Sequence, residues 1–172
     1  MIGHDEGFKM SSSDNNKRLL AVIRIRGIPS INPDASHTLA LLRLHKRNHL
    51  VLVHNVKDII GMLRKAKDYI TWGEISLETL EKLLRKRGRI IGNKKLTDEF
   101  VKSNTKFSGI SELAKALYNC EIKLTDIPQI KPVFRLNSPS GGFKKSIKRP
   151  YGDGGELGYR GEDINKLIER MM

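Results

Sequence analysis

The residues of this chain best suited to bind a polyanion lie between Phe134 and Tyr159. This segment reads FRLNSPSGGFKKSIKRPYGDGGELGY, and the window from Ile127 to Gly152 contains no Asp or Glu. Each Lys or Arg that meets a phosphate releases a condensed counterion, and glycine lets a backbone approach a ligand closely. Phe143 and Tyr151 lie among the cations and offer rings that can stack on unpaired bases. The candidate nucleic-acid contacts in this segment are Arg135, Phe143, Lys144, Lys145, Lys148, Arg149 and Tyr151.

A second basic stretch lies between Arg85 and Lys95. Six of its eleven residues are Lys or Arg, and none is acidic. The same release of counterions makes the stretch a candidate phosphate contact. The residues predicted to contribute are Arg85, Lys86, Arg87, Arg89, Lys94 and Lys95.

Arg24 and Arg26 lie in a predicted strand over Leu19 to Gly27, which reads LLAVIRIRG. Side chains alternate between the two faces of a strand, so Ala21 and Ile23 share one face and the two arginines share the other. Two arginines on one side indicate that this side is not core. We therefore expect an open sheet face that carries Arg24 and Arg26 and docks flat on RNA.

The residue types needed for catalysis or metal binding do not converge in this sequence. The histidines are scattered, and His49 and His54 have opposite strand parity, so they face away from each other. The glycine-rich run at 152–155 does not follow a buried strand, and no Gly-Lys-Ser or Gly-Lys-Thr comes after it. The paired carboxylates Glu162 and Asp163 suit the positive end of a helix dipole, and that role suffices for them. We predict no catalytic residue, no metal site, no cofactor and no small-molecule substrate.

Composition points to the same kind of partner. A net charge of +13 on 172 residues implies a polyanion such as nucleic acid. A membrane is the weaker choice, because no apolar run approaches the roughly 18 residues that span a bilayer. Cys120 is the only cysteine, which excludes a disulfide framework and a cysteine-based metal site.

Apolar periodicity predicts alternating strands and helices in the first half of the chain. Helix-start residues stand at Asn32 and Pro33, and a second helix is expected to pack its apolar stripe beside the first. The predicted elements are a strand over 19–27, a helix to about residue 46, a strand over 49–54, a helix to about residue 67 and a strand over 69–75. Crossovers of this size place both helices on one face of a small sheet and leave the other face open.

The sequence predicts three parts of the chain: a disordered leader over 1–18, the β-α-β-α-β core over 19–75, and a helical appendage over 76–172. Ser76 caps the first helix of the appendage, and short helices are expected over 97–103 and 111–119. A polar, glycine-rich tail buries too little apolar surface to order itself, so we expect it to order only against RNA. A last helix docks on the body through Ile164, Leu167, Ile168 and Met171.

Three stretches of the sequence resemble a known family. They are AVIRIRGIP, the helix and strand ASHTLALLRLHKRNHLVLV, and the tail GGFKKSIKRPYGDGGELGYRGEDINKLI. Together they are similar to the archaeal and eukaryotic form of the large-subunit ribosomal protein family L-thirty, called L-seven in eukaryotes. The resemblance covers about Leu19 to Met172, and the tail is its most specific part.

The resemblance implies an α+β fold: a three-stranded antiparallel sheet of order 3-1-2 with two helices on one face, ferredoxin-like in part. It implies a cytoplasmic, structural role in the large ribosomal subunit rather than an enzyme. The partner is large-subunit ribosomal RNA, with five-S ribosomal RNA and neighbouring ribosomal proteins as further candidates. One alternative is an assembly factor of the same family that leaves the mature particle, although such paralogues usually carry a longer leader. An RNA-processing enzyme is the other alternative, and the sequence shows no convergent acid, base or cofactor loop for it.

Overall fold

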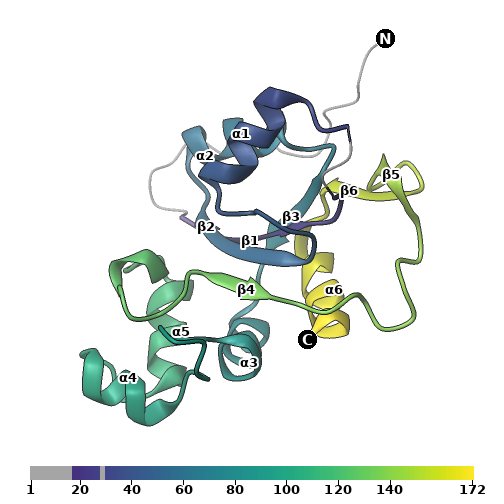
Figure 1. The fold of residues 1–172 in the computed structure, drawn as a ribbon. Helices are drawn as coiled ribbons and strands as arrows, with labels where there is room; N and C mark the ends of the chain where they lie inside the picture. Colours follow the sequence, from purple (N-terminus) through teal and green to yellow (C-terminus); the bar gives the residue numbers. More distant parts are fainter. Residues whose placement is uncertain (1–16, 28–29) are drawn as a thin grey trace.

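The computed structural model describes residues 17–27 and 30–172, so the predicted leader lies almost wholly outside the described residues. The described chain forms one mixed sheet with helices on both sides (Figure 1). The strands are β1 (Leu19–Arg24), β2 (His49–His54), β3 (Ile70–Glu74), β4 (Val133–Arg135), β5 (Ser146–Pro150) and β6 (Gly155–Tyr159). The helices are α1 (Pro33–Leu41), α2 (Lys57–Lys65), α3 (Leu77–Arg87), α4 (Asp98–Asn104), α5 (Ile110–Tyr118) and α6 (Ile164–Met171), with short 3-10 turns η1 (Leu124–Asp126) and η2 (Gly161–Asp163).

The sheet has six strands in the order β4-β2-β1-β3-β6-β5. Its centre is the antiparallel β2-β1-β3 unit that the resemblance implied, with Val22 opposite Val51 on one side and Trp72 on the other. The α+β class is therefore confirmed, but the three-stranded extent is wrong. The C-terminal half adds β4 antiparallel to β2 and β6 parallel to β3.

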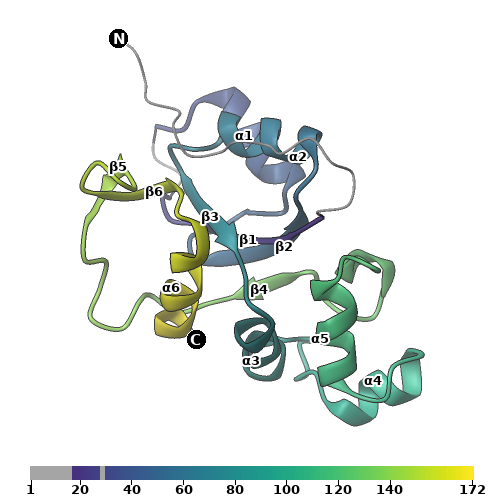
Figure 2. The ribbon, with the colours of Figure 1, turned by 180° about the vertical axis from the view of Figure 1, so that it is seen from behind.

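Helices cover both faces of this sheet, so the predicted open face does not exist. The first face packs Leu20 and Val22 of β1 against α1 and α2. The second packs Ala21 and Ile23 against α3, α5 and α6, which lie on the opposite side from α1 and α2 in both views (Figures 1 and 2). The sequence signal for this arrangement is that β1 is apolar at both parities, as expected of a strand buried on both faces.

Arg24 consequently lies inside the molecule, with only 4% of its surface exposed. Its Nη1 donates to the carbonyl oxygen of Leu44 at 2.8 Å, and its Nε donates to the carbonyl oxygen of Arg26 at 2.9 Å. Burial lowers the pKa of the guanidinium, although arginine stays charged in proteins. Arg26 is half-buried, with its guanidinium 5.5 Å from the centre of the Tyr69 ring. The strand parity was read correctly, but the expectation that these arginines face open solvent is wrong.

The helix boundaries follow the local chemistry of the chain. The Asn32 side chain accepts a hydrogen bond from the backbone N–H of Asp34 at 3.0 Å, and Pro33 occupies the first helical position of α1. That helix ends at Leu41 rather than near residue 46, because Arg43 takes a left-handed conformation with φ 63°. The Ser76 hydroxyl caps α3 by accepting from the N–H of Thr79 at 3.2 Å, as predicted. No helix in the described part of the chain is long and apolar enough to cross a membrane.

Part of the glycine-rich tail is built into the sheet. Gly155, Glu156 and Leu157 of β6 are buried, which contradicts the expectation that the tail cannot order itself. Two glycines are required by close packing: a Cβ at Gly73 would lie 1.9 Å from the carbonyl oxygen of Gly161, and one at Gly155 would lie 1.7 Å from that of Arg149. These glycines permit contact between backbones rather than flexibility. The last helix docks as predicted, with Ile164, Leu167, Ile168 and Met171 all buried.

A buried ion pair fixes β6 against β3. Arg160 Nη2 lies 2.7 Å from Glu156 Oε2, and both side chains are only 5% exposed. The Nε of Arg160 donates to the Thr71 hydroxyl at 2.8 Å, and the Arg160 backbone N–H donates to the carbonyl oxygen of Trp72 at 2.9 Å. The guanidinium is thus bonded both to the tail and to the central sheet.

Replacing Arg24 by alanine is expected to lower the free energy of unfolding by about 2 kcal/mol, because a buried carbonyl loses its donor and the hydrocarbon stem loses its packing. Arg26→Ala is the matched control and should change it by less than about 1 kcal/mol, since that side chain keeps contact with water. Urea denaturation of both variants checks the difference. Equal effects would mean that the buried contacts of Arg24 add nothing to stability.

Replacing Glu156 by glutamine should destabilise the fold by about 3 kcal/mol, because it leaves the buried Arg160 charge without its counter-ion. Glu121→Gln, at an exposed carboxylate after α5, should have almost no effect. The readout is the midpoint of urea denaturation followed by the fluorescence of Trp72 in β3. An unchanged midpoint for Glu156→Gln would show that β6 contributes nothing to the cooperative core.

Candidate nucleic-acid interface

The tail presents exposed cations that no carboxylate of the described residues neutralises. Lys144 and Lys145 lie just before β5, and Lys148 and Arg149 lie within it; all four are exposed. In the part of the chain that the structure describes, none of the four forms an ion pair with a carboxylate. Because β6 holds β5 at the edge of the sheet, these charges are carried on an anchored strand. They are available to phosphates.

The two aromatic residues of the tail are engaged by the protein itself. The Tyr151 ring has Lys145 Nζ and the Arg160 guanidinium each 4.9 Å from its centre. Its hydroxyl donates to Asp163, and this bond together with burial raises the pKa of Tyr151. Phe143 is partly buried against the main core and anchors the loop that leads to β5. Both residues position the tail cations, whereas the sequence predicted that their rings stack on bases.

The second basic stretch forms the end of α3 and a short hairpin. The hairpin closes with Arg89 opposite Lys95, and the Ile90 N–H donates to the carbonyl oxygen of Lys94 at 2.9 Å. Its turn requires left-handed conformations at Gly92, φ 85°, and Asn93, φ 61°. Lys86, Lys94 and Lys95 are exposed in this region.

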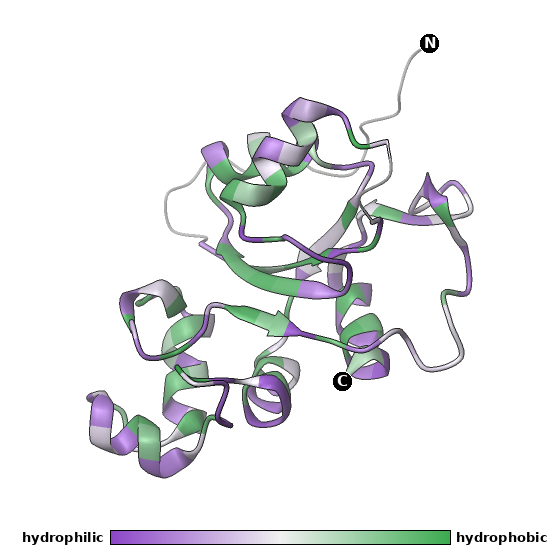
Figure 3. Ribbon diagram, viewed as in Figure 1, coloured by the Kyte–Doolittle hydropathy of each residue, from purple (hydrophilic) through white to green (hydrophobic). Residues whose placement is uncertain are grey.

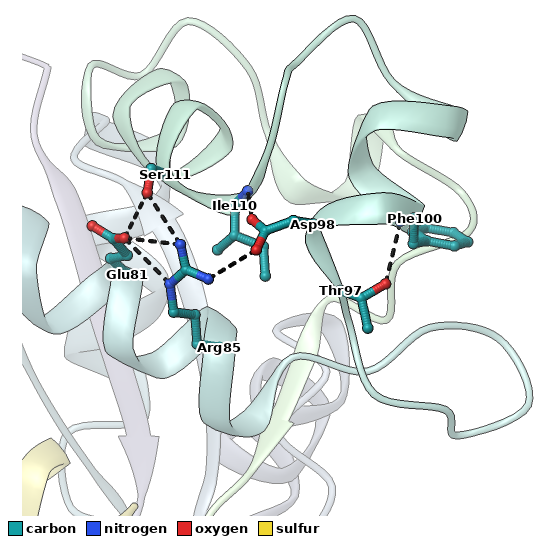
Figure 4. Close-up of polar contacts among 7 residues, drawn as sticks. All are labelled: Glu81, Arg85, Thr97, Asp98, Phe100, Ile110 and Ser111. Atoms are coloured by element: carbon teal, nitrogen blue, oxygen red, sulfur yellow. Dashed lines mark hydrogen bonds and ion pairs between the residues drawn. The ribbon is translucent and has the colours of Figure 1, made fainter.

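The arginines of this stretch are partly committed to the fold. Arg85 lies 3.2 Å from Glu81 and 3.1 Å from Asp98, and it also bonds the Ser111 hydroxyl, so it joins α3 to α4 and α5 (Figure 4). Asp98 in turn accepts from the Ile110 N–H at 2.8 Å, and this bond and Arg85 lower the pKa of Asp98. The main role of Arg85 is therefore to hold α3, α4 and α5 together.

The other two arginines of the stretch also bond the backbone. Arg87 donates to the backbone oxygen of Met172 at 2.8 Å, and Arg89 donates to the carbonyl oxygen of Gly88 at 3.0 Å. Both are half-buried and keep part of their surface in solvent. Within the hairpin region, the lysines are thus freer to meet a phosphate than the arginines.

The structure brings together a third basic group that the sequence analysis missed. The connection between α1 and β2 carries Arg43, His45, Lys46 and Arg47, all exposed, and Figure 3 shows it as a hydrophilic stretch. It lies at the end of the sheet where Arg135 pairs with His49 and the chain enters the tail. The signal was present, because residues 35–57 contain no Asp or Glu.

His49 reports the positive potential at this end of the sheet. Burial lowers its pKa first, and the charges of Arg135, Lys46, His45 and Arg24 lower it further. No carboxylate contributes to the shift. A site with this many cations and no fixed counter-ion attracts a polyanion.

No metal centre competes with this interpretation in residues 17–27 and 30–172. No group of three or more His, Cys, Asp or Glu residues there could hold a metal ion. The paired carboxylates Glu162 and Asp163 lie in η2, immediately before α6, where the helix dipole favours them. Asp163 additionally accepts the Tyr151 hydroxyl, which gives it a structural role.

Comparison with known proteins identifies the family. Residues 20–70 match the family model described as ribosomal protein L30p/L7e. The chain is 58% identical over 159 residues to the large ribosomal subunit protein uL30 of Staphylothermus marinus, covering 90% of this chain and 98% of the relative. It is 52% identical over 181 residues to that of Hyperthermus butylicus, with the whole of both chains covered, and 45% identical over 153 residues to that of Methanocorpusculum labreanum, covering 89% of this chain and 99% of the relative. At this identity and coverage, the chain belongs to the uL30 family of large ribosomal subunit proteins.

Proposed function

We propose that this chain is a constituent of the large ribosomal subunit that binds ribosomal RNA through phosphate contacts on three basic surfaces. The tail surface consists of Lys144, Lys145, Lys148 and Arg149. The hairpin surface consists of Lys86, Lys94 and Lys95, with support from Arg87 and Arg89. The sheet-end surface consists of Arg43, His45, Lys46, Arg47 and Arg135. In this proposal residues 76–172 carry the first two surfaces, and residues 19–75 carry most of the third.

The observation that supports the proposal most strongly is that the fold buries or pairs some basic side chains and leaves others exposed without a carboxylate partner. Arg24 and Arg160 are buried, and Arg85 forms two ion pairs, so their charges are already compensated or bonded. The lysines of the tail and hairpin have no carboxylate partner in the described residues. The net charge of +13 on the whole chain also favours release of counterions on RNA.

The tail and hairpin surfaces are carried on anchored elements, and this favours positioning of the RNA over base recognition. The tail cations stand on β5 and on the loop anchored by Phe143, and the hairpin cations stand on a hydrogen-bonded turn. Phosphate contacts from anchored elements set register and orientation but carry no sequence information directly. We expect the RNA to be recognised by the shape that places its phosphates opposite all three surfaces. Five-S ribosomal RNA and neighbouring ribosomal proteins remain further partners in this proposal.

Replacing Lys144, Lys145, Lys148 and Arg149 together by glutamine should reduce the magnitude of the log–log salt slope of binding by about 3 to 4, since each phosphate contact contributes roughly 0.7 to 0.9. The measurement is a filter-binding titration against purified large-subunit ribosomal RNA across a range of salt concentrations. A charge-matched control replaces Lys57, Lys65, Lys102 and Lys115, which are exposed on α2, α4 and α5. If both variants lose the same slope, the tail is no special contact and only net charge matters.

The protein should remain with mature large subunits when a lysate of its own cells is sedimented through a high-salt gradient. The protein can leave the particle only when salt screens its phosphate contacts on all three surfaces at the same time. Quantitative mass spectrometry should find about one copy per particle. Recovery in precursor particles but not in mature subunits would favour the assembly-factor alternative.

A further inference from the structure

A groove beside the part of β2 that β4 does not cover has no role in the fold and shares only Arg43 with the proposed RNA contacts. It encloses about 420 Å³ between the α1 and α2 layer on one side and the connection from α5 to η1 on the other. That volume lies within the range of known ligand sites, roughly 300–1,000 Å³. Leu41 and Val56 line it while 60% and 38% exposed, and they are two of the four large hydrophobic side chains exposed in the described residues.

The groove exists because strand pairing stops at a proline. β4 pairs with β2 from His49 opposite Arg135 to Val51 opposite Val133. Continuing this register would place Pro132 opposite Leu52, but proline has no N–H to donate to the next strand. The chain leaves the sheet at this point, since the Lys131 N–H donates instead to the carbonyl oxygen of Arg89 at 2.9 Å. Pro132 therefore cannot donate to the carbonyl oxygen of Leu52, which is left facing the groove.

The charges around the groove have one sign. Among its lining residues, Lys17, Arg43 and Lys123 are charged, and all three are cations. Asp126 in the adjoining turn accepts a hydrogen bond from the Lys123 backbone N–H at 2.9 Å, so it caps η1. An occupant with an apolar side and a carboxylate would match both the walls and the rim.

We propose that this groove binds an extended segment of a neighbouring protein chain, which adds to the edge of β2 at Leu52, places apolar side chains against Leu41 and Val56, and directs a carboxylate to Lys123. Addition of a peptide to an exposed strand edge is a recurrent mode of recognition: main-chain hydrogen bonds supply affinity, and pockets for alternate side chains supply specificity. It also covers an edge that would otherwise invite non-specific pairing.

Two features favour a peptide over RNA in this groove. The lining contains no Phe, Tyr or Trp, the aromatic rings on which unpaired bases stack. The aliphatic walls would also remove water from a phosphate without replacing its hydrogen bonds. The inference rests on the proposed function only in that the neighbouring chain is sought within the large subunit.

The test places a photo-crosslinking amino acid, p-benzoylphenylalanine, at position 41 of the full chain, in cells that assemble it into large subunits. Purified subunits are irradiated, and the attached molecule is identified by mass spectrometry. We expect a peptide of another protein that contains apolar residues and at least one Asp or Glu. Adding Lys123→Glu should lower the yield at least threefold, whereas Lys115→Glu, at an exposed position of α5 that does not line the groove, should leave it unchanged.

A parallel experiment places the same crosslinker at Ile91, which is 65% exposed on the basic hairpin. That position should crosslink to ribosomal RNA, so its failure would count against the proposed function and not against the groove. With the Ile91 control successful, attachment of position 41 to RNA, to a second copy or within its own chain would overturn the groove proposal. The groove proposal would also be overturned if no crosslink formed, if the attached peptide had no carboxylate, or if Lys123→Glu left the crosslinking yield unchanged.

Discussion

The need to cover both faces of β1 shapes the rest of the molecule. Leu20 and Val22 point to one face, Ala21 and Ile23 point to the other, and all four are fully buried. Burying a side chain of the size of Leu, Val or Ile stabilises a fold by about 1.5–3 kcal/mol, so neither face can be left in water without a large loss. Helices α1 and α2 cover the first face only. The second face requires α3, α5 and α6, which explains why residues after Ser76 contribute to the same core as β1.

The same constraint divides the cations into two classes. Arginines close to the packed layers, such as Arg24, Arg85 and Arg160, donate to carbonyls or carboxylates that the packing would otherwise leave unpaired or unbalanced. Arginine suits these places because its planar group makes several hydrogen bonds at once. Lysines and the loop cations lie beyond the layers and keep their charge in solvent. A count of basic residues therefore overstates the number that can meet RNA.

The tail contains both residues that hold the fold together and cations that stay in solvent. Glu156, Arg160 and Gly155 fix β6 in the sheet, and Tyr151 and Phe143 hold the loop that precedes them. The cations between these anchors are carried at the edge of the molecule on a strand of fixed direction. A preordered contact loses less conformational entropy on binding than a flexible one, so anchoring favours tight association with a rigid partner.

The resemblance to the family implied the α+β class and the central β2-β1-β3 order. The sequence alone determined the alternation of strands and helices over residues 19–75, the caps of α1 and α3, and the docked last helix. These depend on short-range periodicity and capping, which residues a few positions apart decide between them. It also predicted a polyanionic partner, because net charge can be counted without a structure. Only the tertiary structure decided the partners of Arg24, the burial of Glu156 with Arg160 and the clustering of Arg43 to Arg47 beside Arg135. Each of these depends on packing between segments distant along the chain: the Glu156–Arg160 pair is local, but it is buried because β6 lies beside β3. Strand alternation alone cannot say whether a second layer will cover a face. For that reason Arg24 was expected at the surface, while the tertiary fold placed it in the core.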